Sequence, residues 1–62
     1  MDAHKRAVKA LNTAGYFFKR TGANHDIYFN AENRRIIPLK RHDFDEADLR
    51  YIEKEIKQGR QK

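Results

Sequence analysis

The sequence predicts an α+β fold in which two helices cover one face of a three-stranded antiparallel sheet. Apolar residues recur at helical spacing near both ends of the chain, three short strand-like segments lie between them, and Gly and Asn mark the intervening turns. The predicted order is α-β-β-β-α, a two-layer sandwich. A chain of 62 residues is near the lower limit for independent folding, so we predict one domain, 1–62.

The first helix is predicted from Asp2 to Ala14. Asp2 is a favourable N-cap, and Ala7, Leu11 and Ala14 recur at helical spacing. Gly15 follows the last of them, as is typical of a helix C-terminus.

Three strands are predicted in the middle of the chain. The first is rich in aromatic residues, and the turns after the first and second strands contain the Gly and Asn residues that favour reversals. Pro38 lacks a backbone N–H, which indicates that the third strand lies at an edge of the sheet. The strands are expected at residues 16–20, 25–30 and 35–40.

The second helix is predicted from Asp45 to about residue 58. Asp45 is the expected N-cap, and Asp48 occupies the capping-box position three residues later. Gly59 is expected to end the helix. The apolar stripe of this helix consists of Leu49, Ile52 and Ile56.

Alternation along the strands divides their side chains between two faces. We expect the core face, under the helices, to hold Tyr16, Phe18, Ile27, Phe29, Ile36 and Pro38. The opposite face is then expected to hold Phe17, Lys19, Tyr28, Ile37 and Leu39. So much apolar surface on an outward face predicts that a protein partner covers it.

The composition excludes several classes of protein. The chain has no cysteine, which excludes a disulfide framework and thiolate zinc sites and favours a reducing compartment. Charged residues interrupt every apolar stretch, so neither a signal peptide nor a membrane span is expected. A cytoplasmic location without membrane contact follows as the prediction.

The charge favours a polyanionic partner. Fourteen Lys and Arg oppose nine Asp and Glu, for a formal net charge of +5. Residues 1–42 carry nine basic and three acidic side chains, whereas residues 43–62 carry five and six. The first two-thirds of the chain is therefore expected to face nucleic acid or an acidic protein surface, although basic surfaces are also common in proteins that bind neither.

The residue inventory leaves few kinds of catalysis. His4, His25 and His42 do not form a metal-ligand spacing, and the chain has no serine, no cysteine and no glycine-rich phosphate loop, so neither a metal nor a cofactor is expected. RNA brings its own nucleophile, the 2′-hydroxyl. Histidine, with an ordinary pKa of about 6.5, is suited to remove that proton.

The strand register predicts a basic cluster around His25. If the first turn is centred near Ala23 and the second near Glu32-Asn33, His25 lies opposite Arg20 on one side and Lys40 on the other, with residues 41–42 close by. Each residue also has an ordinary structural role, because a histidine beside a turn is commonly exposed and a basic rim is commonly solvated. The residues alone therefore indicate a small basic domain whose partner is RNA or an acidic surface.

From Leu11 to Ile56 the chain resembles the HicA toxins, the small ribonuclease partners of HicB antitoxins in toxin-antitoxin pairs. Order, spacing and length all agree with that family. The matching segments are Leu-x-x-x-Gly with an aromatic strand (11–18), Gly22-Ala23-Asn24-His25, Pro38 followed by Arg41-His42, and Asp48-Leu49-Arg50.

The resemblance implies a fold like that of double-stranded-RNA-binding domains and a metal-independent endoribonuclease, an mRNA interferase, inhibited by a HicB-type antitoxin. The family's catalytic histidine follows a Gly-Ser turn and corresponds to His25. Two departures are present: Ala23 replaces the turn serine, and residues 39–40 separate Pro38 from Arg41-His42 where the family has Pro-Arg-His in succession.

The resemblance and the residue chemistry together assign the remaining roles. The residues expected to contact mRNA are Lys19, Arg20, Gly22, Asn24, Lys40, Arg41 and His42. The residues expected to contact the antitoxin, which would also set the oligomeric state of the complex, are Phe17, Tyr28, Ile37 and Leu39.

The alternative is a non-catalytic RNA-binding module of the same fold. Such a module places lysines at the start of its last helix to bind phosphates across a groove. This chain has acidic residues there instead, which would repel phosphate: Asp43, Asp45, Glu46 and Asp48. A purely structural or adaptor domain is a third possibility, if the basic rim meets no nucleic acid.

Overall fold

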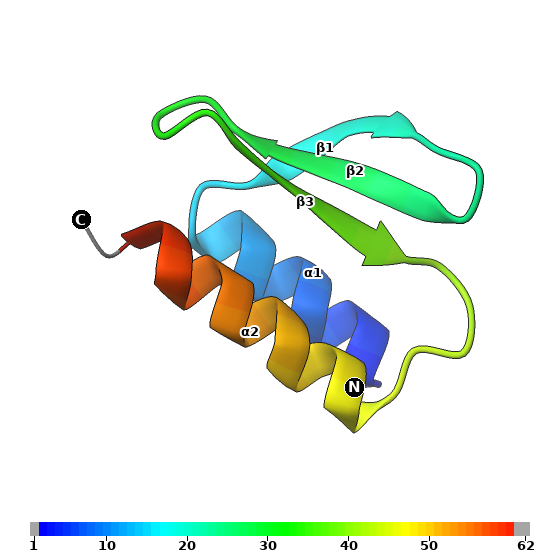
Figure 1. Cartoon of the computed structure of the whole chain (residues 1–62). Coiled ribbons are helices and arrows are strands. Elements are labelled where there is room, and N and C mark those ends of the chain that lie inside the picture. Colours follow the sequence, from blue (N-terminus) through cyan, green and yellow to red (C-terminus); the bar gives the residue numbers. More distant parts are fainter. Residues whose placement is uncertain (1, 61–62) are drawn as a thin grey trace.

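The computed structural model describes residues 2–60 of the chain (Figure 1). The element order confirms the predicted α-β-β-β-α fold. The elements are α1 (Ala3–Thr13), β1 (Phe17–Thr21), β2 (His25–Asn30), β3 (Arg35–Lys40) and α2 (Glu46–Arg60).

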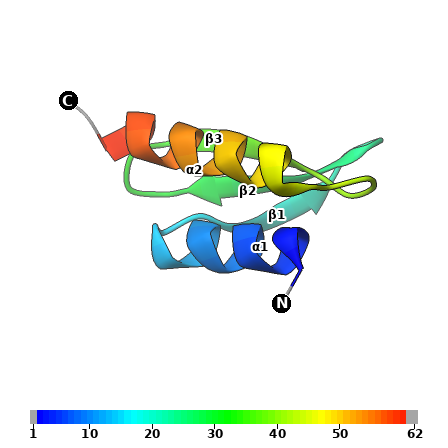
Figure 2. The same cartoon turned by 90° about the horizontal axis from the view of Figure 1, so that it is seen from below.

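The helices form one layer and the sheet forms the other. Figure 1 shows both helices below the sheet, and Figure 2 shows them side by side and running in the same direction. An ion pair joins their exposed surfaces, with 2.7 Å between Arg6 Nη1 and Glu46 Oε2. The other face of the sheet is covered by no element of residues 2–60 (Figure 1).

The sheet is an antiparallel meander in the order β1-β2-β3. Strand β3 is therefore at an edge, as Pro38 predicted. The pairing of β2 with β3 is regular from His25↔Lys40 to Asn30↔Arg35. The pairing of β1 with β2 is interrupted between Phe18 and Arg20, where Lys19 is the extra residue of a β-bulge.

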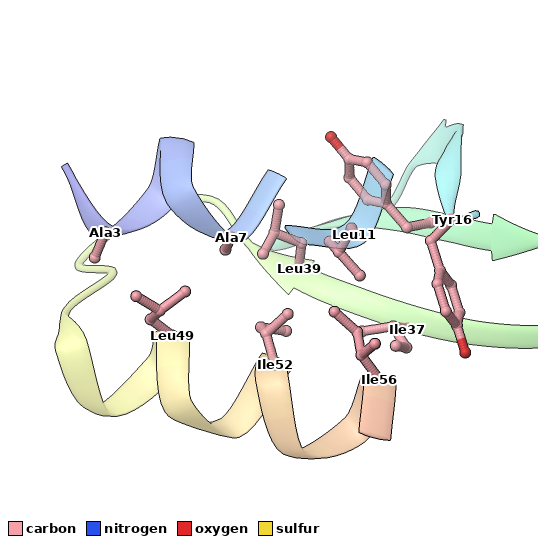
Figure 3. Packing of buried hydrophobic residues seen from close by; sticks show 10 residues of the cluster. Ala3, Ala7, Leu11, Tyr16, Ile37, Leu39, Leu49, Ile52 and Ile56 are labelled. Carbon is pink, nitrogen blue, oxygen red and sulfur yellow. The ribbon is translucent and has the colours of Figure 1, made fainter. Parts of the chain in front are cut away.

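The core lies between the helices and the sheet (Figure 3). Ala7 and Leu11 of α1 are fully buried, as are the side chains that face them from the sheet and from α2. Removal of this apolar surface from water is the main contribution that stabilises so small a domain. The buried apolar residues are Ala3, Ala7, Leu11, Tyr16, Tyr28, Ile37, Leu39, Leu49, Ile52 and Ile56.

The predicted assignment of the two sheet faces is wrong for β2 and β3. Tyr28, Ile37 and Leu39, expected on the outward face, are buried under the helices, whereas Ile36, expected in the core, is 54% exposed. In β1, Phe17 lies outward as predicted, and Phe18 pairs with Tyr28 on the core side but is 55% exposed. Every strand carries apolar residues on both faces, so alternation finds the two rows without indicating which one the helices cover. The remaining residues predicted for the core divide as follows: Tyr16 is buried, Pro38 is exposed, and Ile27 and Phe29 are half-buried.

This inversion changes the expected protein-binding surface. Tyr28, Ile37 and Leu39 belong to the hydrophobic core and are not accessible to an antitoxin. Phe17, which is 59% exposed, is the one residue of that predicted set that remains on the surface. The outward apolar face exists, but Phe29 and Ile36 join Phe17 on it in place of the three buried residues.

The helix N-termini are capped as predicted. The side chain of Asp2 accepts a hydrogen bond of 2.8 Å from the backbone N–H of Lys5. Asp45 and Asp48 form a reciprocal capping box, in which each backbone N–H donates to the other residue's carboxylate at 3.0 and 3.1 Å. These bonds fix the residues at which α1 and α2 begin.

Gly59 does not end α2, which continues to Arg60. The absence of a side chain at Gly59 serves packing instead. A Cβ atom there would lie 2.8 Å from Tyr16 Oη and 2.9 Å from Arg35 Nε. Gly59 thus permits the last turn of the helix to approach β3 and the residue before β1.

Neither helix within residues 2–60 combines the length and the apolar character needed to cross a lipid bilayer.

Candidate functional site

His25 begins β2 at the end of the sheet that carries the first hairpin turn. It is half-buried and lies directly opposite Lys40 of β3, which confirms this part of the predicted register. The two residues occupy the row that faces away from the helices, because Leu39, their neighbour in the alternation, is buried beneath the sheet. A titratable ring and an ammonium group therefore share one rim.

The backbone of His25 closes the first hairpin turn. Its carbonyl accepts a hydrogen bond of 2.7 Å from the backbone N–H of Gly22. Gly22 is half-buried, and a Cβ atom there would lie 3.0 Å from that same carbonyl, so the close approach favours glycine. Asn24 is exposed at the tip of the turn.

Arg41 fixes this turn from the opposite strand. Its Nη2 donates to the carbonyl of Ala23 at 2.7 Å, and its Nη1 lies 3.0 Å from the carbonyl of Gly22 and 3.2 Å from that of His25. The same Nη1 forms an ion pair with Asp26 Oδ1 at 3.2 Å. Arg41 was expected to contact RNA, but the structure commits its guanidinium to the turn that precedes His25.

Lys40 is partly neutralised by the start of α2. Its Nζ lies 3.1 Å from Asp48 Oδ2. The hydrogen bond from the backbone N–H of Asp45, and after it the bond from Lys40, lower the pKa of Asp48 from its ordinary value. Lys40 remains 40% exposed, so its charge is still accessible at the rim.

Arg20 does not lie opposite His25. The bulge at Lys19 shifts the register, and Arg20 pairs with Ile27 while Thr21 pairs with Asp26. The exposed Arg20 side chain is therefore two positions along the sheet from His25. The predicted pairing is wrong because regular alternation leaves no place for the extra residue of a bulge.

Lys19 lies near the other end of the sheet. Its Nζ is 4.8 Å from the centroid of the Phe29 ring, a cation–π contact. It lines an open groove of about 590 Å³ together with Gly15, Phe17, Phe18, Phe29, Asn30, Ala31 and Glu32. Lys19 thus lies at the opposite end of the outward face from the His25 rim, although both were predicted as one RNA site.

His42 is exposed in the loop after β3. Its neighbour Arg41 donates a backbone hydrogen bond of 3.3 Å to the carbonyl of Asn24, which brings this loop beside the first turn. The structure therefore gathers His25, Lys40, Asn24 and His42 at one end of the sheet.

Asn30 has an organising role that the sequence analysis did not identify. It is only 4% exposed, and its Nδ2 donates to the carbonyl of Ala14 at 3.1 Å. Its Oδ1 accepts from the backbone N–H groups of Glu32 and Asn33. Asn30 thereby connects the end of α1 to the second hairpin turn, and an Asn between a strand and a turn was the only signal in the sequence.

The side chain of Asp26 faces the core side of the sheet and affects Tyr28. Burial, and to a smaller extent the charge of Asp26, raises the pKa of the Tyr28 hydroxyl from its ordinary value of 10.0. Asp26 is itself paired with Arg41. The one acidic side chain within the strands is thus withdrawn from the outward face.

Within residues 2–60, His, Asp and Glu side chains form no cluster of three or more that would suit a metal ion. The chemistry that these residues support is proton transfer by His25 beside a cationic rim. Comparisons with models of protein families, with curated proteins and with solved structures each give no match to this chain.

Proposed function

We propose that this chain is a metal-independent endoribonuclease that cleaves mRNA, with His25 as the catalytic residue. The observation that carries the proposal is the direct pairing of His25 with Lys40 at the sheet end. This pairing puts a proton-transfer group next to a positive charge. The resemblance to the HicA toxins implies the same role for His25. On that resemblance we also propose that the chain is the toxin of a type II toxin-antitoxin system.

The proposed reaction uses the nucleophile that RNA supplies. His25 takes the proton of a 2′-hydroxyl, the 2′-oxygen forms a bond to the adjacent phosphorus, and the bond from phosphorus to the 5′-oxygen breaks. The products are a 2′,3′-cyclic phosphate and a 5′-hydroxyl, whose proton comes from a protonated group at the rim. Lys40 and His42 are the two candidates for that proton donor, and Lys40 also stabilises the charge on phosphorus.

The roles within the RNA-binding set differ under this proposal. Lys40, Asn24 and His42 contact the strand at the cleavage site, whereas Arg41 acts as a positioning residue through the turn that precedes His25. Arg20 and Lys19 bind phosphates farther along the sheet. A HicB-type antitoxin would inhibit the enzyme in the cytoplasm by covering the His25 rim, with Phe17 as the apolar part of the contact.

The test is expression of the wild type and of His25→Ala in a bacterial host, with growth and total mRNA followed over time. Loss of a general acid or base is expected to slow cleavage by about 10²- to 10⁴-fold. We therefore expect wild type to arrest growth and generate new 5′-hydroxyl RNA ends, and His25→Ala to do neither. His4→Ala is the histidine control, since His4 lies on α1, in the helix layer, with its ring packed against Phe44. Circular dichroism of both variants verifies that they fold.

If His25→Ala folds normally and remains as toxic as wild type, the nuclease proposal fails. RNA binding without cleavage by the purified wild type would instead support the non-catalytic RNA-binding module. Addition of EDTA to the cleavage assay separates the proposed mechanism from a metal-dependent one, because the proposed reaction continues in its presence.

A further inference from the structure

The outward face of the sheet carries a row of large apolar side chains. Phe17, Phe29 and Ile36 are direct cross-strand partners and form one row across all three strands. Phe17 is 59% exposed and Ile36 is 54% exposed. Because both helices lie on the other side of the sheet (Figure 1), this row is open to solvent in the isolated chain.

Two aromatic rings and a cation define the groove at one end of this row. Phe17 and Phe29 line it from neighbouring strands, and Lys19 Nζ lies 4.8 Å from the centre of the Phe29 ring. The groove has a volume of about 590 Å³ and is open to solvent. An exposed aromatic ring beside a lysine on a sheet surface is the arrangement on which unpaired nucleic-acid bases stack.

The charge of the outward face favours a polyanion over a protein. Arg20 and Lys40 lie in its outward-facing rows, and Lys19 projects from the bulge. Asp26, the acidic residue of the strands, lies on the core side and is paired with Arg41. Glu32, in the second turn, is the one carboxylate among the residues that line the groove, and Lys19 is the one cation.

We propose that this face binds single-stranded RNA, with a base stacked on the exposed ring of Phe17 and the RNA backbone beside Lys19. The inference rests on the proposed nuclease function and adds how the substrate is held. His25 and Phe29 lie four residues apart on β2, which is about 13 Å at the strand rise of about 3.3 Å per residue. The stacked base therefore lies a few nucleotides from the phosphodiester that is cleaved beside His25.

Binding is tested with a fluorophore-labelled 2′-O-methyl RNA oligonucleotide of mixed sequence, which has no free 2′-hydroxyl and is not cleaved. Phe17→Leu keeps an apolar side chain but removes the ring, and we expect its Kd to rise by about 5- to 150-fold, the usual effect of losing one stacked base. Phe17→Tyr retains the ring and is expected to bind as wild type does. Tyr51→Leu, which removes a ring that is 56% exposed on α2, away from this face, is the matched control and is expected to bind as wild type does.

A second measurement reports stacking directly. The chain has no tryptophan, so Phe17→Trp introduces a single tryptophan into the groove, whose emission is distinct from that of the three tyrosines. Unlabelled oligonucleotide is used here. We expect the tryptophan emission to be quenched when the oligonucleotide binds. Unchanged emission at saturation, or a Phe17→Leu protein that binds as tightly as wild type, overturns the stacking proposal.

The two proposals fail in distinguishable ways. Cleavage that persists in His25→Ala contradicts the catalytic role and leaves the Phe17 measurements valid. If Phe17→Leu instead retains full RNA affinity and abolishes a self-association of wild type seen by sedimentation, the face is a protein interface and the RNA assignment is wrong. Thermal unfolding of each variant verifies that the fold is intact.

Discussion

Arg41, just after β3, reaches across the sheet to Asp26 of β2, with 3.2 Å between Nη1 and Oδ1. The same guanidinium donates to three backbone carbonyls, those of Gly22 and Ala23 in the preceding turn and that of His25 at the start of β2. A buried or half-buried carbonyl must have a hydrogen-bond donor, and here a single side chain supplies three of them. The position of His25 therefore depends on a residue sixteen positions away in the sequence.

Arg41→Lys is expected to destabilise the protein despite the conserved charge. A lysine ammonium cannot reproduce the planar set of donors that Arg41 presents, and hydrogen bonds to charged groups contribute about 1.5–3 kcal/mol. We expect the free energy of unfolding, measured by urea denaturation, to fall by that amount. Arg20→Lys, at an exposed position of β1, is the control and is expected to leave the free energy of unfolding unchanged. An equal effect at both positions would contradict the role of the Arg41 hydrogen bonds.

Asn30→Ala tests the junction between α1 and the second turn. The change removes three hydrogen bonds at a buried site, so we expect a loss of about 2–3 kcal/mol in the free energy of unfolding. Asn33→Ala is the matched control, because the exposed Asn33 side chain accepts one bond, from the N–H of Arg35. If the two variants unfold at the same denaturant concentration, Asn30 does not have the role described.

Gly59→Ala is expected to destabilise α2, although the same change in an exposed helix stabilises by about 1 kcal/mol. The added Cβ would meet Tyr16 Oη at 2.8 Å and Arg35 Nε at 2.9 Å. Overpacking of this kind costs about 1–3 kcal/mol, which outweighs the gain in helix propensity. Thermal unfolding followed by circular dichroism measures the net change.

Tyr16→Phe provides the companion variant. The buried Tyr16 hydroxyl has no hydrogen-bond partner within residues 2–60, so its removal is expected to leave stability unchanged or to increase it. In the Tyr16→Phe background Gly59→Ala should cost less, because one of the two close contacts is relieved. If Gly59→Ala lowers the free energy of unfolding equally in wild type and in Tyr16→Phe, the Tyr16 hydroxyl does not cause the steric conflict.

The capping box predicts a dependence of stability on acid pH. The folded protein lowers the pKa of Asp48 below its ordinary value of 3.8, so the unfolded chain binds the proton more tightly. The contribution of Asp48 is therefore complete above about pH 3.8 and is lost as the pH falls through the lower folded value. Urea denaturation between pH 7 and pH 2 should show a smaller acid-induced loss in the free energy of unfolding for Asp48→Asn than for wild type. If the two proteins lose the same free energy over this pH range, Asp48 does not contribute to the acid dependence.

The sequence predicted the order of the elements well because each has a local signal. The N-caps at Asp2 and Asp45 and the edge position of Pro38 depend on residues adjacent in the chain, and all three agree with the structure. The His25–Lys40 pair also followed from the length of the second turn. These features need only local geometry.

The sheet faces and the role of Arg41 could not be predicted in the same way. Phe29 and Tyr28 are adjacent aromatic residues of β2, and only packing against the helices determines which of them is buried. The bulge at Lys19 breaks the alternation of β1 without a glycine to mark it. Arg41 binds carbonyls that the sequence does not distinguish from any others.

The irregularity of β1 has a consequence for how the free protein behaves at high concentration. A sheet with an open apolar face and two unpaired edges is ordinarily prone to join other sheets edge to edge and to aggregate. Here the bulge and the charges of Lys19 and Arg20 interrupt one edge, and Pro38 removes a donor from the other. The chain therefore keeps its aromatic face uncovered without offering a continuous strand on which a fibril can grow.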